Sequence, residues 1–326
     1  MADRRWALSL ELPGLTLPQH EPIVRAAEEA GYTDAWSGET GGHDGFTPLL
    51  MAAAWTERMR LGTGVVNVFT RGPAVLAQHA SALQDASEGR FCLGIGSSSN
   101  VIVERWNGIP FEKPVSRVRE TVEFLRQALA GERTERGGFK LEQPPPAPVP
   151  IVIAALRGRM LRAAAELGDG AFVNFTPLSS LPQVMAELEG CPDVLCRFFC
   201  IQGDPEGALP LARTMFAAYA TVPVYEQFFR WLGHGEAIDP MVDAWRSGDR
   251  NRARELAPRD LIEDIFILGD ADTQRARLEA YAAAGITTPV VLPIPHPERM
   301  GEPPVELYGE LVESLRPDFA RPASAG

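Results

Sequence analysis

The chain is poor in lysine, and its charge is shifted toward the acidic side. Lys113 and Lys140 are the only lysines among 31 basic residues, and 43 acidic residues bring the net charge to −12. Nucleic acids and anionic membranes are bound by basic faces, so this charge excludes both as expected partners. The abundance of arginine, alanine, glycine and proline is typical of a GC-rich genome, such as an actinobacterial one.

Cysteine is also scarce, and several common catalytic motifs are missing. The four cysteines, Cys92, Cys191, Cys196 and Cys200, show no CxxC spacing. This pattern indicates reduced side chains that serve as small buried hydrophobes in a cytoplasmic protein. The sequence has no HExxH motif, no His or Asp cluster at metal-ligand spacing and no GxSxG motif. We therefore expect no metal site and no hydrolase of the nucleophile-elbow type.

Long apolar runs are absent as well. No segment approaches the length of a membrane span, and the segment MADRRWALSLELPG is too short in its apolar part for a signal peptide. We expect a cytoplasmic protein without a membrane partner. The 326 residues, 45% of them hydrophobic, suit one α/β barrel of about 250 residues with insertions, hence a single domain over residues 1–326.

One local pattern recurs along the chain: a helix, a glycine and then an apolar strand. The glycines at these joints are Gly31, Gly89, Gly168 and Gly285. Repeated β-α units of this kind predict a parallel sheet. Strands are expected near residues 6–12, 32–36, 61–66, 90–95, 150–154, 170–174, 194–201 and 288–292. Eight units predict a (β/α)8 TIM barrel. A doubly wound open sheet is the alternative, but the GxGxxG motif that would support it is absent after the first strand.

Two stretches exceed a minimal barrel. Residues 131–150 contain a polyproline-like run, and residues 221–264 are predicted to form a helical insertion before the last strand. The insertion is rich in aromatic residues, which either cover the mouth of the barrel or pack on its outside. The tail at 316–326 is expected to fray.

The segment RLGTGVVNVFTRGP at residues 60–73 combines a buried strand with two glycines. Glycine within a strand marks a bulge or a close approach to the backbone, so Gly62 and Gly64 indicate either the floor of a ligand site or two tolerated glycines. Asn67 stands where the strand ends, and Pro73 opens the following helix.

The predicted C-terminal strand ends, where barrel enzymes have their sites, carry mostly small and amide side chains. This composition suits a flat cofactor that supplies its own chemistry. The segment from Ala154 to Arg159 enters a helix with Arg157 and Arg159 beside it. It predicts an anion site for a phosphate, the alternative being two solvated arginines. Among ionisable groups, Glu39 and His43 follow the second strand and are the catalytic candidates.

Five segments carry a resemblance that covers nearly the whole chain. They are GYTDAWSGET (31–40), RLGTGVVNVFTRGPAVLA (60–77), SEGRFCLGIGS (87–97), PIVIAALRGRMLRAAAELGDGAFVN (150–174) and LGDADTQRARLEAYAAAG (268–285). In this order and at this spacing the sequence resembles the luciferase-like superfamily, and within it the branch of coenzyme F420-dependent oxidoreductases.

The resemblance implies a TIM barrel with the cofactor in its C-terminal mouth. A non-prolyl cis peptide bond in the third strand would support the deazaflavin ring, and here it would join Gly64 and Val65. The other residues implied to bind the cofactor are Asn67, Gly96, Ser97, Ala154, Ala155, Arg157 and Gly158. The implied reaction is hydride transfer between the deazaflavin and an organic substrate. Arg71, Arg157 and Arg159 are expected to meet the anionic tail of coenzyme F420.

The chain departs from the family's sugar-phosphate dehydrogenases at two places. Their Asp-His pair after the second strand is replaced by Gly38-Glu39-Thr40, and their glutamate after the fourth strand by three serines at 97–99. Their proton relay therefore does not carry over. The family's glycine-rich loop after the fifth strand has Leu156 and Arg157 in place of glycines.

Three functions are compatible with these residues. The first is an F420-dependent oxidoreductase acting on a small-molecule substrate. The second is an FMN-dependent monooxygenase of the same superfamily, which uses reduced flavin and oxygen. The third is a barrel that has lost its cofactor and serves as a subunit; the retained Gly64 and Asn67 count against it. A homodimer is expected, because dimers are common in the family and among homo-oligomers. The aromatic insertion points to an apolar or ring-bearing substrate.

Overall fold

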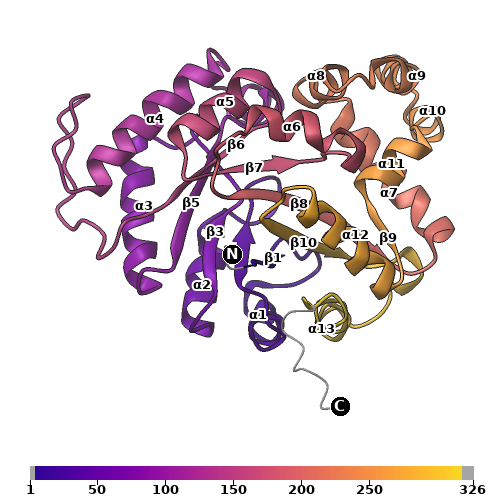
Figure 1. Ribbon diagram of the computed structural model, residues 1–326, viewed down its shortest axis with the longest axis horizontal. Coiled ribbons are helices and arrows are strands. Elements are labelled where there is room, and N and C mark those ends of the chain that lie inside the picture. The colour runs from indigo at the N-terminus through magenta and orange to yellow at the C-terminus, as the bar shows by residue number, and fades with distance from the viewer. Residues whose placement is uncertain (1–3, 318–326) are drawn as a thin grey trace.

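In the computed structural model, which describes residues 4–317, eight parallel strands close into a barrel surrounded by helices (Figure 1). Neighbours in the barrel follow the order β1, β2, β3, β5, β6, β7, β8 and β10, and β10 closes the ring by pairing with both β8 and β1. The barrel strands are β1 (Ala7–Ser9), β2 (Asp34–Ser37), β3 (Arg60–Thr63), β5 (Phe91–Gly96), β6 (Ile151–Ala154), β7 (Gly170–Asn174), β8 (Val194–Gln202) and β10 (Thr288–Ile294). The predicted TIM barrel is confirmed, and the open sheet is excluded.

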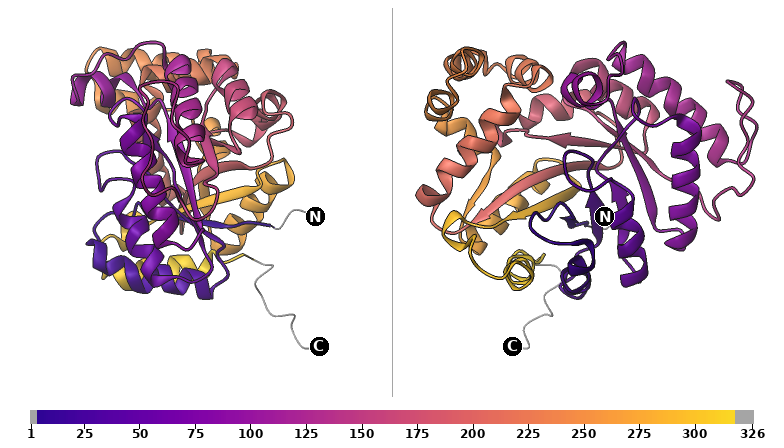
Figure 2. Two further views of the ribbon diagram at one scale, coloured as in Figure 1. Left: turned by 90° about the vertical axis from the view of Figure 1, so that its left-hand side faces the viewer. Right: turned by 180° about the vertical axis from the view of Figure 1, so that it is seen from behind.

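Helices on the outside connect successive strands, so the C-terminal ends of all the barrel strands lie on the same face of the barrel (Figures 1 and 2). The first and last of them, α1 and α13, pack side by side next to the N-terminal strand. The helices are α1 (His20–Glu29), α2 (Thr47–Trp55), α3 (Pro73–Ala86), α4 (Pro114–Leu129), α5 (Gly158–Leu167), α6 (Leu181–Glu187), α7 (Pro205–Ala220), α8 (Pro223–Trp231), α9 (Gly235–Arg246), α10 (Arg250–Glu255), α11 (Arg259–Ile265), α12 (Ala271–Ala283) and α13 (Pro304–Ser314).

The glycines at the helix-to-strand joints serve two different purposes. Gly31, Gly89 and Gly285 have positive φ values of 94°, 87° and 118°, a conformation that favours glycine at the end of a helix. Gly168 instead has φ −88°, and a Cβ there would lie 2.8 Å from two backbone oxygens. The joint therefore recurs in sequence, although close packing, not a left-handed turn, requires the glycine at this position.

The third strand is interrupted, as the resemblance implied. The short strand β4 (Val66–Asn67) continues it after a break, and the peptide bond between Gly64 and Val65 is cis. Added Cβ atoms would lie 2.3 Å from the Trp36 ring at Gly62 and 2.9 Å from the Phe172 ring at Gly64. These glycines are thus places of close approach and not merely tolerated.

The strand β9 (Ile267–Gly269) was not predicted. It pairs with the second half of β8, while β7 pairs with the first half of the same edge. With only three residues, β9 has too little pattern to be distinguished from a turn.

The two additional stretches differ in structure. Residues 131–150 contain no helix or strand and are held by side chains of α3, where Ser81 and Gln84 donate to backbone carbonyls of the stretch. Residues 221–264 form α8 to α10 and most of α11, as a helical insertion before the last strand. Of the tail predicted to fray, residues 318–326 lie outside the described residues. No helix in the described range 4–317 is long and apolar enough to span a membrane.

Candidate functional site

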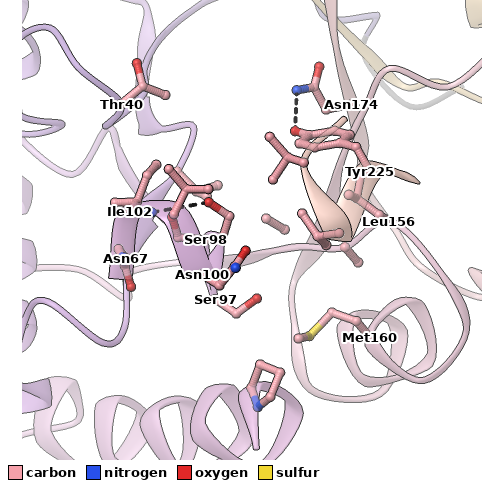
Figure 3. A pocket seen from close by; sticks show the side chains of 18 of the residues that line it. Thr40, Asn67, Ser97, Ser98, Asn100, Ile102, Leu156, Met160, Asn174 and Tyr225 are labelled. Atoms are coloured by element: carbon pink, nitrogen blue, oxygen red, sulfur yellow. Dashed lines mark hydrogen bonds between the residues drawn. The ribbon is translucent and has the colours of Figure 1, made fainter. Parts of the chain in front are cut away.

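A cavity of about 770 Å³ opens at the C-terminal ends of the barrel strands (Figure 3). Its walls come from most strand ends and from the start of α8. They are mainly apolar, with a few polar groups placed on opposite sides, as is typical of sites for organic ligands. The polar and charged residues in the wall include Glu11, Glu39, Thr40, Asn67, Ser97, Ser98, Ser99, Asn100, Arg157, Arg159, Asn174, Arg197, Tyr225 and Gln227.

One wall is built around the break in the third strand. Gly64, Val65 and Asn67 all line the cavity there. Asn67 is only 4% exposed, and its Oδ1 accepts a hydrogen bond of 2.7 Å from the amide of Phe69. This bond fixes the amide orientation, and the buried Nδ2 has no hydrogen-bond partner among the described residues. A buried unpaired donor is costly, so this wall is suited to a bound molecule that offers an acceptor.

The segment after β5 forms a second part of the same wall. Ser97 lines the cavity, and Ser98 has φ 60°, which turns the chain into a π-helical segment at Val101–Trp106. Gly96, also predicted to bind the cofactor, is buried behind this surface, and a Cβ there would lie 2.9 Å from that of Ala154. Gly96 therefore contributes close packing of β5 against β6 and is not part of the cavity surface.

The loop after β6 carries the predicted anion site. Ala154, Ala155 and Arg157 line the cavity, whereas Gly158, the first residue of α5 with φ 46°, does not. The Arg157 side chain donates a hydrogen bond to Gln227 of α8, and its buried Nε has no partner among the described residues. The guanidinium is thus held across the cavity rim with donor capacity left over.

The two predicted catalytic residues occupy different places. Glu39 lines the cavity, and its carboxylate forms an ion pair with Arg71, which lies over the ring of Phe46. Arg71 is therefore engaged with Glu39 and is not part of the cavity wall. His43 is exposed in the loop after β2 and lies outside the cavity. The structure therefore brings Glu39, but not His43, together with the other site residues.

Another part of the wall holds a polar group that the sequence analysis did not assign. Glu11 follows β1, and its carboxylate forms an ion pair with Arg197 of β8, whose side chain is only 9% exposed. Gly38 is needed beside them, because a Cβ there would lie 2.6 Å from the Glu11 carboxylate. Burial opposes charge on Arg197, but the facing carboxylate of Glu11 outweighs it, so the pKa of Arg197 is raised.

A second polar pair stands next to this ion pair. Asn174, the last residue of β7, donates from Nδ2 to the hydroxyl oxygen of Tyr225 on α8 at 3.1 Å (Figure 3). Burial raises the pKa of Tyr225 to about 12, so its hydroxyl is protonated at neutral pH. The position of Asn174 and Glu11 at strand ends was a usable signal. No feature of the neighbouring sequence indicated that Arg197 or Tyr225 would belong to the site.

Groups for other chemistries are missing from residues 4–317. No three His, Cys, Asp or Glu side chains gather there in a way that would hold a metal ion. Burial raises the pKa of Cys92 to about 12 and also raises those of Cys196 and Cys200. These thiols are therefore not reactive nucleophiles.

Comparison with known proteins finds relatives over most of the chain. The family described as luciferase-like monooxygenase matches residues 8–288. A Mycobacterium tuberculosis protein that carries the name of a coenzyme F420-dependent oxidoreductase is 29% identical, over 89% of this chain and 95% of its own length. A 5,10-methylenetetrahydromethanopterin reductase of Archaeoglobus fulgidus is 35% identical, over 50% of this chain and 51% of its own.

Solved structures share the fold. The coenzyme F420-dependent tetrahydromethanopterin reductase of Methanopyrus kandleri superposes with a TM-score of 0.74 at 23% identity, covering 96% of this chain and 98% of that one. An F420-dependent secondary alcohol dehydrogenase gives 0.70 at 14% identity, covering 96% and 99%. The oxygenating constituent of 3,6-diketocamphane monooxygenase from a Pseudomonas putida plasmid, in complex with FMN, gives 0.62 at 17% identity, covering 97% and 98%.

Proposed function

The chain belongs to the luciferase-like monooxygenase family, and from this premise we propose that it transfers a hydride between coenzyme F420 and a small organic substrate. The enzyme is an oxidoreductase; the deazaflavin and the hydride transfer are the proposal. Its support among relatives is the F420-dependent oxidoreductase that matches most of the chain.

The observation that carries the proposal is the unpaired amide of Asn67. Its Nδ2 is buried, has no partner among the described residues and lies two residues beyond the cis bond at Gly64–Val65. A flat heterocycle placed against this bond would meet the Asn67 donor with an acceptor at its edge. Ser97, Ala154 and Ala155 line the adjoining surface without bulky side chains, so the residues present fit a tricyclic ring with a phosphate-bearing side chain.

Charge at the rim favours a deazaflavin over FMN. Arg157 and Arg159 both line the cavity where the cofactor side chain would leave it. The glutamate-bearing tail of coenzyme F420 has several negative charges, which two arginines would help to neutralise. The FMN-dependent monooxygenase remains the alternative, because structures of that class share the fold.

When bound, the cofactor would supply or accept the hydride. The protein would orient the two reactants and exclude water. Leu156 and Met160 face the cavity from the side of α5 (Figure 3), and Val222 faces it from the start of α8. Glu39, which the Arg71 ion pair holds in the cavity wall, is the predicted catalytic group placed to exchange a proton with a bound molecule.

Parallel fluorescence titrations of the full chain with coenzyme F420 and FMN test the proposal. We expect tight binding of F420 and weak binding of FMN. Tighter binding of FMN would favour the monooxygenase, and binding of neither would favour a barrel without a cofactor.

The anion site is tested by Arg157→Ala, which should weaken F420 binding at least several-fold. Arg162→Ala is the matched control, because Arg162 lies on α5, the helix that Arg157 directly precedes, but pairs with Glu187 at the surface. An unchanged F420 affinity of Arg157→Ala would remove the phosphate assignment.

A further inference from the structure

The amide of Asn174 can take only one orientation. Its Oδ1 accepts a hydrogen bond of 3.1 Å from the backbone N–H of Phe175. An amide oxygen accepts and an amide nitrogen donates, so this bond assigns the two ends and turns Nδ2 toward Tyr225. The hydroxyl oxygen of Tyr225 is therefore an acceptor in its bond with Asn174.

The wall around this pair is held firmly in place. Phe175 has φ 53°, a left-handed conformation that is rare for a bulky side chain and persists only where the surroundings enforce it. Its ring packs against Phe199, Tyr219 and Tyr225 at centroid distances of 4.7, 4.5 and 5.7 Å. The backbone of Asn174 and the ring of Tyr225 are thus fixed by one aromatic cluster.

The hydroxyl hydrogen of Tyr225 is consequently not donated to another group among residues 4–317. The hydroxyl is protonated at neutral pH, and its bond with Asn174 uses only the oxygen. No hydrogen bond donated by the Tyr225 hydroxyl is found among residues 4–317, and Tyr225 lines the cavity. The remaining direction for the O–H bond is the cavity itself.

The charges nearby cancel. Arg197, the cation that faces Tyr225, is already paired with Glu11. The same wall is completed by Val222 and Val224, which offer apolar surface, and by Tyr219, which adds a ring with its hydroxyl. A carboxylate or phosphate placed here would meet a cation that is already paired with Glu11, although the Arg197 Nε has no hydrogen-bond partner among the described residues. An uncharged molecule with an acceptor atom would satisfy the free hydroxyl without adding a charge.

We infer that Tyr225 is the hydrogen-bond donor that selects the substrate, and that Asn174 positions it. The ligand class is a neutral, ring-bearing molecule with a carbonyl oxygen or imine nitrogen that accepts from Tyr225. This inference rests on the proposed function for its chemical meaning, because the carbon of such a C=O or C=N group is where a hydride would be exchanged. Its test, however, needs neither a cofactor nor turnover.

The test compares two bicyclic probes that differ in a single oxygen, 1-indanone and indane, with indane-1-carboxylate as a charged third probe. Dissociation constants are measured by ligand-observed NMR on the full chain. Tyr225→Phe removes the hydroxyl, and with it both the donor and the acceptor of the Asn174 bond. Asn174→Asp preserves the shape of the side chain but replaces the donor Nδ2 by an acceptor oxygen. The Tyr225 hydroxyl should then donate to the new carboxylate and no longer point into the cavity. Tyr308→Phe is the control, because Tyr308 loses a hydroxyl bonded to Pro13 outside the cavity.

We expect Tyr225→Phe and Asn174→Asp each to weaken 1-indanone binding about 3- to 10-fold, as the loss of one neutral hydrogen bond predicts, with indane changed less than 2-fold. Tyr308→Phe should leave both constants unchanged. An unchanged ratio of the two constants in Tyr225→Phe, no saturable binding of 1-indanone to the wild type, or tighter binding of the carboxylate than of the ketone would overturn the inference.

Titration of the same proteins with coenzyme F420 separates this inference from the proposed function. Both variants should bind F420 within 2-fold of the wild type. If F420 does not bind but the ketone-to-hydrocarbon ratio falls as expected, the donor stands and the cofactor assignment fails. If F420 binds and the ratio does not change, the cofactor assignment stands and the donor fails.

Discussion

Replacing Glu11 by leucine should destabilise the protein severely. Arg197 is 9% exposed at its side chain and depends on Glu11 for its only ion pair among residues 4–317. Without Glu11 a guanidinium stays buried with no counter-charge, which costs about 3–5 kcal/mol in proteins where such a pair has been broken. Both side chains are less than a quarter exposed, so solvent screening lowers this value little.

An exposed pair in the same chain provides the comparison. Arg259 and Glu206 form an ion pair with side chains that are 46% and 65% exposed. Pairs of this kind contribute about 0–1 kcal/mol. Glu206→Leu should therefore cost at most about 1 kcal/mol in the free energy of unfolding, several times less than Glu11→Leu.

Urea unfolding followed by tryptophan fluorescence measures these differences. In a double-mutant cycle, Arg197→Met in the background of Glu11→Leu should recover much of the lost stability, because the unpaired charge is removed. The reasoning is refuted if Glu11→Leu costs no more than Glu206→Leu, or if the double variant is no more stable than Glu11→Leu. Either result would mean that the guanidinium is hydrated through the cavity.

Three further predictions concern the barrel. Gly94→Ala should lower the free energy of unfolding by about 3 kcal/mol or more, because its Cβ would lie 1.8 Å from a backbone oxygen. Gly309→Ala, which places a Cβ in open space within α13, should raise the free energy of unfolding by about 0.5–1 kcal/mol in the same urea assay. Burial opposes charge on Asp193, but the charge of Arg60 outweighs this effect, so the pKa of Asp193 is lowered. Asp193→Asn should thus cost about 2–3 kcal/mol in the free energy of unfolding at pH 7. This difference in stability from the wild type should persist above about pH 4 and shrink as the pH falls through the lowered pKa of Asp193. A thiol reagent should modify Cys191, the half-buried cysteine, before the other three in the native protein, as mass spectrometry after brief labelling would show.

The barrel could be predicted because its signals are local. A glycine at each helix-to-strand joint and the apolar strands that follow are readable within about a dozen residues, and all eight barrel strands lie where the sequence predicts them. The strand β9 could not be predicted, since its three residues are recognised only by their pairing with β8. Gly168 shows a further limit. A close backbone contact, and not a turn, requires the glycine there, and the sequence pattern cannot distinguish the two.

The site divides in the same way. The wall formed by Gly64, Val65 and Asn67 is contiguous in sequence and could be proposed from one segment. Other parts of the wall join Glu11 to Arg197 and Asn174 to Tyr225, pairs separated by 186 and 51 positions. Such pairs exist only once the barrel closes. His43 was placed by its distance from a strand end, which cannot tell a residue that faces the cavity from one that faces solvent.

The helical insertion combines the two roles between which the sequence could not decide. Glu226 of α8 is buried and forms ion pairs with Arg230 of the same helix and Arg246 of α9, so these pairs join two helices of the insertion to each other. The adjacent residue, Tyr225, lines the cavity. Because Tyr225 is joined to the end of β7 by its hydrogen bond with Asn174 and by the ring of Phe175, α8 is held against the barrel as a fixed wall of the cavity. A fixed wall is what a single free hydroxyl needs to discriminate between substrates, since a donor that moves with its helix would adapt to many acceptors.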